Sequence, residues 1–286
     1  MDDLARVRSQ AVGQEADEAL LAQYPVKEQR ELMIPTRHGQ VKVYLYRPFS
    51  SKETFPVLIN FHGGGFVKGY RGRDIGFSRI AATKAECIVL DVDYKIAPEY
   101  KYPYAVEEGY DLYLYVKEHA GEFGWDKDKI AFSGASAGAN MATVITMMLK
   151  KAGEPLPLCV VSCYPPYDLF TDPGEKMPGE DPERVSAARL YNGWYADESV
   201  QNTSYVSPVF AAKEELEGLP PFTIMAAGKD SLCKEALKFA YMLMEAGVTV
   251  TARKVQGAKH GFLVRRAQGF ELGEELLFGT LNYYFQ

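Results

Sequence analysis

A serine flanked by glycines is the clearest candidate nucleophile in this sequence. Ser136 lies at the centre of GASAG, residues 134–138, between an apolar segment with strand character and a segment with helical spacing. A nucleophile elbow requires this setting, because its serine occupies a sharp turn and the flanking glycines leave room for the strained backbone. The segment therefore predicts a nucleophilic serine.

A histidine followed by three glycines is the second unusual segment. His62 precedes Gly63, Gly64 and Gly65, directly after an apolar run. Glycine loses more backbone freedom on folding than other residues, so three in succession indicate either a flexible turn or a backbone that approaches a ligand closely. Attack by serine on an ester creates an oxyanion, which the N–H groups of two of these glycines and of Ala137 would bind.

A serine hydroxyl needs a base, and the chain has four histidines that could serve. His38 lies in an early polar turn, and His119 ends an amphipathic helix, where it would interact with the helix dipole. His260 lies in GAKHGF, just past the last expected strand, where a loop could bring it to the carboxyl edge of the sheet. We therefore predict His260 as the base, and expect His62 to hold the glycine loop in place.

The third group should be a carboxylate that follows a strand between the serine and the histidine. Asp230 follows FTIMAAGK and begins a helix, so it could also cap that helix. Asp168 follows LCVVSCYPPY and could instead be a turn residue. Asp230 is favoured, and Asp168 stays open.

The elements that must position these residues alternate between strand and helix patterns, which predicts a mostly parallel sheet covered by helices. The strands are expected at 41–48, 56–61, 86–94, 129–134, 157–165, 222–228 and 248–256. The helices are expected at 104–120, 137–153, 231–247 and 270–284.

Two segments depart from this alternation. Residues 1–35 are polar and are expected to be helical without a strand partner. Residues 170–206 form a long insertion between two strands, and connections of this length are usually functional or disordered. The insertion carries Tyr191, Trp194 and Tyr195, so we expect a folded piece that covers something.

Composition excludes several classes of protein. The 286 residues are 47% hydrophobic with a net charge of −6, which argues against nucleic acid or an anionic membrane as partner. No apolar run reaches the ~18 residues of a spanning helix, and the N-terminus lacks the pattern of a secretory signal. A cytoplasmic protein without a metal is therefore expected, with four reduced core cysteines: Cys87, Cys159, Cys163 and Cys233.

These features together resemble the hormone-sensitive-lipase-like branch of α/β-hydrolase esterases, which is often grouped with acetyl esterases. The resemblance covers nearly all of residues 40–286. The segments that carry it are HGGG (62–65), DYKIAPEYKYPYA (93–105), GASAGAN (134–140), SPVF (207–210), LPPFTIMAAGKDSLCKE (219–235) and HGF (260–262).

The resemblance implies an α/β-hydrolase fold with a small helical cap. Residues 36–169 and 207–286 would form the catalytic domain, and residues 1–35 and 170–206 would form the cap. The implied catalytic triad is Ser136, Asp230 and His260, with no cofactor or metal. The implied oxyanion donors are the backbone N–H groups of Gly64, Gly65 and Ala137.

The chain departs from the family pattern at three places. The family usually has an acidic residue at the position of Ala135 and often glycine at that of Ala139. Residues 231–234 read SLCK where proline-leucine-arginine-aspartate is usual. None of these changes removes a triad atom, but they leave acyl preference and rate open.

The leading hypothesis is a serine carboxylesterase that hydrolyses short-chain, above all acetyl, esters of small molecules through an acyl-serine. A ligand-binding or receptor protein on the same fold is the alternative from another class, and a burst of p-nitrophenol from its acetyl ester would separate the two. A small peptidase is a third hypothesis, which aminoacyl amides would test. The oligomeric state, including a homodimer, stays open.

Overall fold

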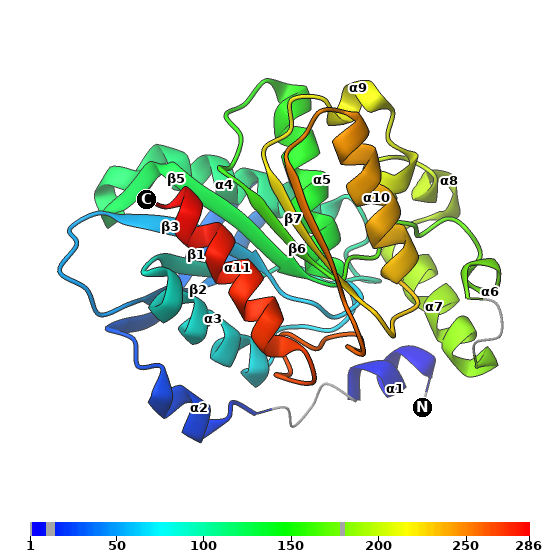
Figure 1. The fold of residues 1–286 in the computed structure, drawn as a ribbon, viewed down its shortest axis with the longest axis horizontal. Helices are drawn as coiled ribbons and strands as arrows, with labels where there is room; N and C mark the ends of the chain where they lie inside the picture. Colours follow the sequence, from blue (N-terminus) through cyan, green and yellow to red (C-terminus); the bar gives the residue numbers. More distant parts are fainter. Residues whose placement is uncertain (1, 10–14, 178–180) are drawn as a thin grey trace.

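A twisted sheet of eight strands forms the centre of the molecule, whose structure is a computed structural model describing residues 2–9, 15–177 and 181–286 (Figure 1). The strands are β1 (Glu28–Thr36), β2 (Gly39–Arg47), β3 (Phe55–Phe61), β4 (Ile88–Asp93), β5 (Trp125–Ala135), β6 (Val160–Cys163), β7 (Phe222–Ala227) and β8 (Val250–Val255). Their order in the sheet is β1-β2-β4-β3-β5-β6-β7-β8. All neighbours pair in parallel except β1 with β2 and β2 with β4, which are antiparallel.

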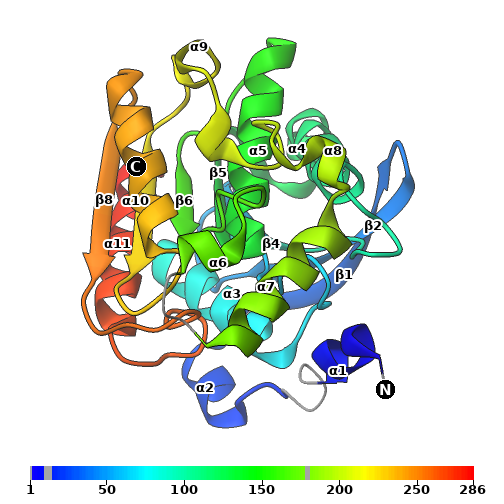
Figure 2. The same cartoon turned by 90° about the vertical axis from the view of Figure 1, so that its right-hand side faces the viewer.

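Helices cover both faces of the sheet (Figures 1 and 2). One face packs against α3 (Gly72–Ala85) and α11 (Phe270–Tyr284), and the other against α4 (Tyr104–Phe123), α5 (Ala137–Ala152) and α10 (Cys233–Glu245). Strand β3 shows why its sequence is a continuous apolar run: Val57 and Ile59 belong to one core, and Leu58 to the other. The predicted doubly covered parallel sheet is therefore confirmed.

The prediction that residues 1–35 are helical without a strand partner is wrong for their last part. Two short helices do occur, α1 (Asp3–Ser9) and α2 (Glu18–Gln23), but β1 then pairs along its whole length with β2. Strand β1 lies at the edge of the sheet, and most of its side chains are exposed or half-buried, so it shows no apolar run. Helix α3 was also not predicted from the sequence.

The described residues of the insertion, 170–177 and 181–206, contain three helices, in agreement with the folded piece that its aromatic residues predicted. They are α6 (Pro173–Lys176), α7 (Pro182–Tyr195) and α8 (Glu198–Gln201). Val7 of α1 belongs to a small apolar cluster against which Tyr191 and Trp194 of α7 pack, so α1 and α7 lie side by side (Figure 2). A 3-10 turn, η1 (Pro208–Phe210), and helix α9 (Lys213–Leu216) then lead back to β7.

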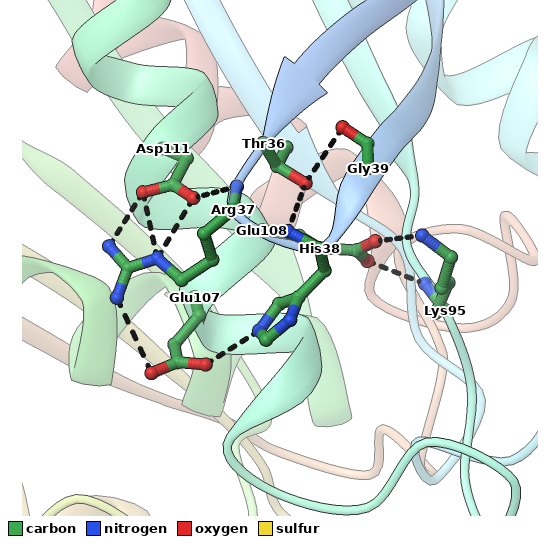
Figure 3. Close-up of polar contacts among 8 residues, drawn as sticks. All are labelled: Thr36, Arg37, His38, Gly39, Lys95, Glu107, Glu108 and Asp111. Atoms are coloured by element: carbon green, nitrogen blue, oxygen red, sulfur yellow. Dashed lines mark hydrogen bonds and ion pairs between the residues drawn. The ribbon is translucent and has the colours of Figure 1, made fainter.

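The hairpin turn between β1 and β2 is clamped onto helix α4 by charged side chains (Figure 3). Arg37 pairs with Asp111, with 2.6 Å between Nη2 and Oδ1. His38 Nε2 lies 2.6 Å from Oε2 of Glu107, and the His38 ring stacks on Tyr104 at a centroid distance of 3.8 Å. These contacts fasten the edge hairpin to the body of the domain.

The structure also tests the predictions about membrane-spanning helices and about the four cysteines. Of the helices in the described part of the chain, none is both long and apolar enough to cross a lipid bilayer. The four cysteines are free and buried, as predicted.

Candidate active site

Ser136 occupies a strained turn between β5 and α5. Its φ and ψ are 54° and −120°, a conformation that residues with a side chain rarely adopt. The flanking glycines are explained by close approach: a Cβ on Gly134 would lie 2.2 Å from the carbonyl oxygen of Gly138, and a Cβ on Gly138 would lie 1.9 Å from that of Phe61. The GASAG segment is therefore required by packing around the turn, as a nucleophile elbow demands.

Two hydrogen bonds, one at each ring nitrogen of His260, connect the predicted serine, histidine and aspartate. His260 Nε2 lies 2.9 Å from Ser136 Oγ, and His260 Nδ1 lies 2.6 Å from Asp230 Oδ2. The Asp230 side chain is only 5% exposed, whereas that of His260 is 36% exposed. The carboxylate is therefore shielded from solvent, whereas the imidazole is accessible from outside.

The two candidate aspartates have different partners. Besides His260, Asp230 accepts the backbone N–H of Leu232 at 3.3 Å, just before α10 begins. Asp168 accepts the backbone N–H groups of Phe170 and Thr171, at 3.2 and 2.9 Å, where the insertion begins. The structure brings Asp230 to the histidine and places Asp168 in a turn.

The three glycines after His62 form a tightly packed loop beside Ser136. Gly64 and Gly65 have φ values of 151° and 62°, which favour glycine. A Cβ on Gly63 would lie 2.8 Å from the carbonyl oxygen of Ala135, the residue before the serine. The loop and the elbow are therefore in direct contact, and a side chain at this position would separate them.

His62 is buried under this loop, and its side chain forms no hydrogen bond with Ser136. Its Nδ1–H donates to the Gly63 carbonyl oxygen at 3.0 Å, and its ring stacks on Tyr94 at 4.3 Å. The Tyr94 hydroxyl donates to the carbonyl oxygen of His62 at 2.9 Å. Burial lowers the pKa of His62, so the imidazole stays neutral. These contacts are those of a residue that holds the loop.

The other two histidines lie away from the serine. His38 belongs to the hairpin clamp, and His119 donates from Nδ1 to the Tyr115 carbonyl oxygen at 3.0 Å within α4. His260 is the histidine that the structure brings to Ser136.

The predicted aromatic residues of α7 lie over the glycine loop. A Cβ on Gly65 would lie 2.4 Å from Cδ1 of Tyr191, so this ring rests directly on the loop. Phe66 stacks on Tyr195 at a centroid distance of 3.6 Å. Helix α7 therefore covers the outer side of the loop.

A buried acidic residue below the loop was not predicted. Asp91 of β4 accepts hydrogen bonds from Asn60 at 2.9 Å, Tyr70 at 3.0 Å and Ser78 at 2.6 Å. Burial raises the pKa of Asp91 to about 8. Asn60 lies two residues before His62, so this polar layer supports the strand ends on which the loop rests.

The sequence motifs also did not predict that Arg71 and Asp74 lie at the site. Their side chains are 4% and 3% exposed, and Arg71 Nε lies 3.3 Å from Asp74 Oδ2. Arg71 Nη2 also donates to the Gly63 carbonyl oxygen. The available signal was a pair of opposite charges three residues apart, shortly after the glycine loop.

Comparisons with known proteins identify the family of this chain. Residues 58–264 match the family described as alpha/beta hydrolase fold. The chain is 34% identical to esterase LipI of Mycobacterium tuberculosis over 239 residues, which cover 82% of this chain and 74% of LipI. It is 28% identical to an arylesterase of Saccharolobus solfataricus over 277 residues, which cover 91% of this chain and 86% of that enzyme.

A solved structure has the same fold over the whole length. EstE1, a thermophilic and thermostable carboxylesterase cloned from a metagenomic library, has a TM-score of 0.88 and 28% identity. The match covers 100% of this chain and 98% of EstE1. The chain therefore belongs to the hormone-sensitive-lipase-like family of α/β hydrolases and is a carboxylic ester hydrolase.

Proposed function

We propose that Ser136 attacks the carbonyl carbon of an ester and forms an acyl-serine intermediate. The observation that carries this proposal is the pair of hydrogen bonds from Asp230 to His260 and from His260 to Ser136, at 2.6 and 2.9 Å. As the new C–O bond forms, the hydroxyl proton moves to His260 Nε2. Asp230 holds Nδ1–H and stabilises the imidazolium.

The second half of the reaction uses the same groups in reverse. The tetrahedral intermediate collapses, the bond to the alcohol oxygen breaks, and His260 returns its proton to that oxygen. Water then enters, and His260 Nε2 removes its proton as the water oxygen attacks the acyl carbon. The bond between this carbon and Ser136 Oγ then breaks, His260 returns the proton to Oγ, and the acid leaves. The proton and acyl transfers of this cycle use only these side chains and water.

We assign the stabilisation of the oxyanion to the backbone N–H groups of Gly64, Gly65 and Ala137. Ala137 is the first residue of α5, and the first N–H groups of a helix have no acceptor within the helix. Gly64 and Gly65 have no side chain that would block the carbonyl oxygen. One such donor typically contributes about 3–4 kcal/mol of transition-state stabilisation.

Short acyl groups, above all acetyl, are the proposed substrates. The contact of Tyr191 with Gly65 supports this choice, because it leaves little room beside the loop on that side. Residues 1–35 and 170–206 would form the cap over the site, except that β1 (Glu28–Thr36) belongs to the sheet. Residues 36–169 and 207–286 would form the catalytic domain. His62 and Gly63 would support the oxyanion loop.

The test is a series of p-nitrophenyl esters from acetate to decanoate, assayed with the native protein and with Ser136→Ala. We expect a p-nitrophenol burst, and kcat/KM that falls as the acyl chain lengthens. A fluorophosphonate should label Ser136, as mass spectrometry would detect. Labelling elsewhere would overturn the acyl-serine, and a maximum at decanoate would overturn the acyl preference. An aminoacyl amide should be cleaved far more slowly, and the reverse order would favour a peptidase.

We further propose that the enzyme acts in the cytoplasm. The four buried free thiols support this location, since disulfides are rare in reducing compartments. A homodimer stays a prediction, which size-exclusion chromatography of the full chain would test.

A further inference from the structure

We propose that Arg71 is a positioning residue for the oxyanion hole, through its hydrogen bond to the carbonyl oxygen of Gly63. This inference rests on the proposed function, in which the N–H of Gly64 binds the oxyanion. Arg71 lies outside the glycine loop and does not contact Ser136 or His260. Its role would be to fix the direction of one peptide group.

Planarity of the peptide bond connects the two groups. The carbonyl of Gly63 and the N–H of Gly64 belong to the same peptide unit, whose atoms lie close to one plane and point in opposite directions. A donor that holds the oxygen therefore also sets where the N–H points. This constraint matters at Gly64, because glycine without a Cβ would otherwise allow the peptide to rotate.

Two donors hold this carbonyl oxygen. His62 donates from Nδ1 at 3.0 Å, and Arg71 donates from Nη2. Because burial lowers the pKa of His62, its contribution is a neutral hydrogen bond. Arg71 supplies the charged one, which is shorter and stronger and polarises the peptide so that its N–H is a better donor.

Asp74 holds the guanidinium in position. Arg71 Nε lies 3.3 Å from Asp74 Oδ2, and the backbone N–H of Arg71 donates to the same oxygen at 3.0 Å. Both side chains are nearly inaccessible, at 4% and 3% exposure. The planar guanidinium therefore bridges a carboxylate and a carbonyl at once, and the ammonium group of lysine cannot reproduce this fork.

The experiment compares Arg71→Lys and Arg71→Met with the native protein on p-nitrophenyl acetate. We expect kcat to fall about 10- to 100-fold in both variants while KM changes less than about two-fold, because the lost contact acts on the transition state. Affinity for a trifluoromethyl ketone, which gives a tetrahedral oxyanion on serine, should fall by the same factor as kcat.

The matched control is Glu274→Gln, which breaks another buried charged cluster. Glu274 of α11 pairs with Lys84 of α3 and with Arg266, which precedes α11, and this cluster shares no residue with the glycine loop or its contacts. It should lower the melting temperature and leave kcat unchanged. If Arg71→Met fails to fold, Arg71→Lys keeps the charge and decides the question.

Native kcat and native affinity for the ketone in Arg71→Lys would overturn the proposal. A loss of kcat without a matching loss of ketone affinity would also overturn it. The acyl-serine proposal is tested separately: turnover by Ser136→Ala would contradict that proposal whatever Arg71 does.

Discussion

The molecule contains two histidine–carboxylate pairs with the same separation and different surroundings. His260 and Asp230 lie 2.6 Å apart at the carboxyl edge of the sheet, and His38 and Glu107 lie 2.6 Å apart at the β1–β2 hairpin (Figure 3). The second ring nitrogen of His260, Nε2, lies within hydrogen-bond distance of Ser136 Oγ. In the hairpin the ring instead stacks on Tyr104.

A hydroxyl, that of Thr36, also lies close to His38 in the hairpin, but its hydrogen bonds are to backbone groups. Thr36 Oγ1 accepts the backbone N–H of His38 at 3.3 Å and donates to the Gly39 carbonyl oxygen at 3.4 Å. A carboxylate can orient an imidazole anywhere in a protein. Reactivity requires a hydroxyl on the opposite ring nitrogen and N–H groups directed at the substrate.

Removing the two hydroxyls should give the largest contrast. Ser136→Ala should lower kcat by about 10⁴-fold or more, because no other group can form the acyl intermediate. Thr36→Ala should leave kcat within about two-fold, since its bonds only shape the hairpin. Steady-state hydrolysis of p-nitrophenyl acetate measures both. Equal losses in the two variants would contradict the contrast.

Changing the two carboxylates should give the next largest contrast. Asp230→Asn should lower kcat by about 10³- to 10⁴-fold, because the amide favours the wrong tautomer of His260. Glu107→Gln should leave kcat near native and lower the melting temperature by a few degrees.

Asp168→Asn serves as the control for a carboxylate that follows a neighbouring strand. It should behave like Glu107→Gln in the kinetic assay. A larger kinetic loss in Asp168→Asn than in Asp230→Asn would transfer the acid role to Asp168.

The carboxyl group of Asp91, which is not paired with a histidine, should affect the pH dependence of stability rather than kcat. Because the pKa of Asp91 is raised to about 8, the folded state keeps this proton between about pH 4 and pH 8, while the unfolded state loses it. Its contribution to the free energy of unfolding therefore falls as pH rises through this range, by up to ~1.4 kcal/mol per pH unit.

Urea unfolding of the native protein and of Asp91→Asn at pH 5, 6, 7 and 8 measures this slope. The variant should lack the part of the pH dependence that Asp91 contributes. Parallel curves for the two proteins would show that the carboxyl group is ionised in the folded state.

The smallest effect is expected from the arginine of the hairpin clamp. Arg37 pairs with Asp111, and its side chain is 42% exposed, so solvent screens this ion pair. Arg37→Ala should lower the free energy of unfolding by about 1 kcal/mol or less, and salt should reduce the difference. The native kcat should persist. A kinetic loss here would mean that the hairpin and the active site are coupled.

Local sequence patterns predicted the strands and helices that are apolar or rich in β-branched residues, and missed those whose pattern is weak. The two edge strands, β1 and β8, show the difference, because in both of them most side chains are exposed or half-buried. Strand β8, VTARKV, begins within the β-branched residues 248–251 and was predicted, whereas β1, EQRELMIPT, begins with four polar residues and was missed. Helix α3 was missed because it buries the polar residues Asp74 and Ser78, which blur its apolar face.

The site was predictable where its residues lie together in the chain. The glycines around Ser136 and after His62 form local motifs, but the choice between Asp230 and Asp168 depends on strand order. Strand β7, before Asp230, is the direct neighbour of β8, before His260, whereas β6, before Asp168, is one strand further away. The contact of Arg71 with Gly63 depends on how the loop folds back, which no spacing shows.

The backbone of Ser136 has a consequence for the durability of the enzyme. A φ of 54° at a residue with a side chain opposes folding whether or not ester is present. Glycine at this position would relieve that opposition and leave a more heat-resistant but inert protein. Under the proposed mechanism, resistance to heat and turnover thus favour different amino acids at this one position.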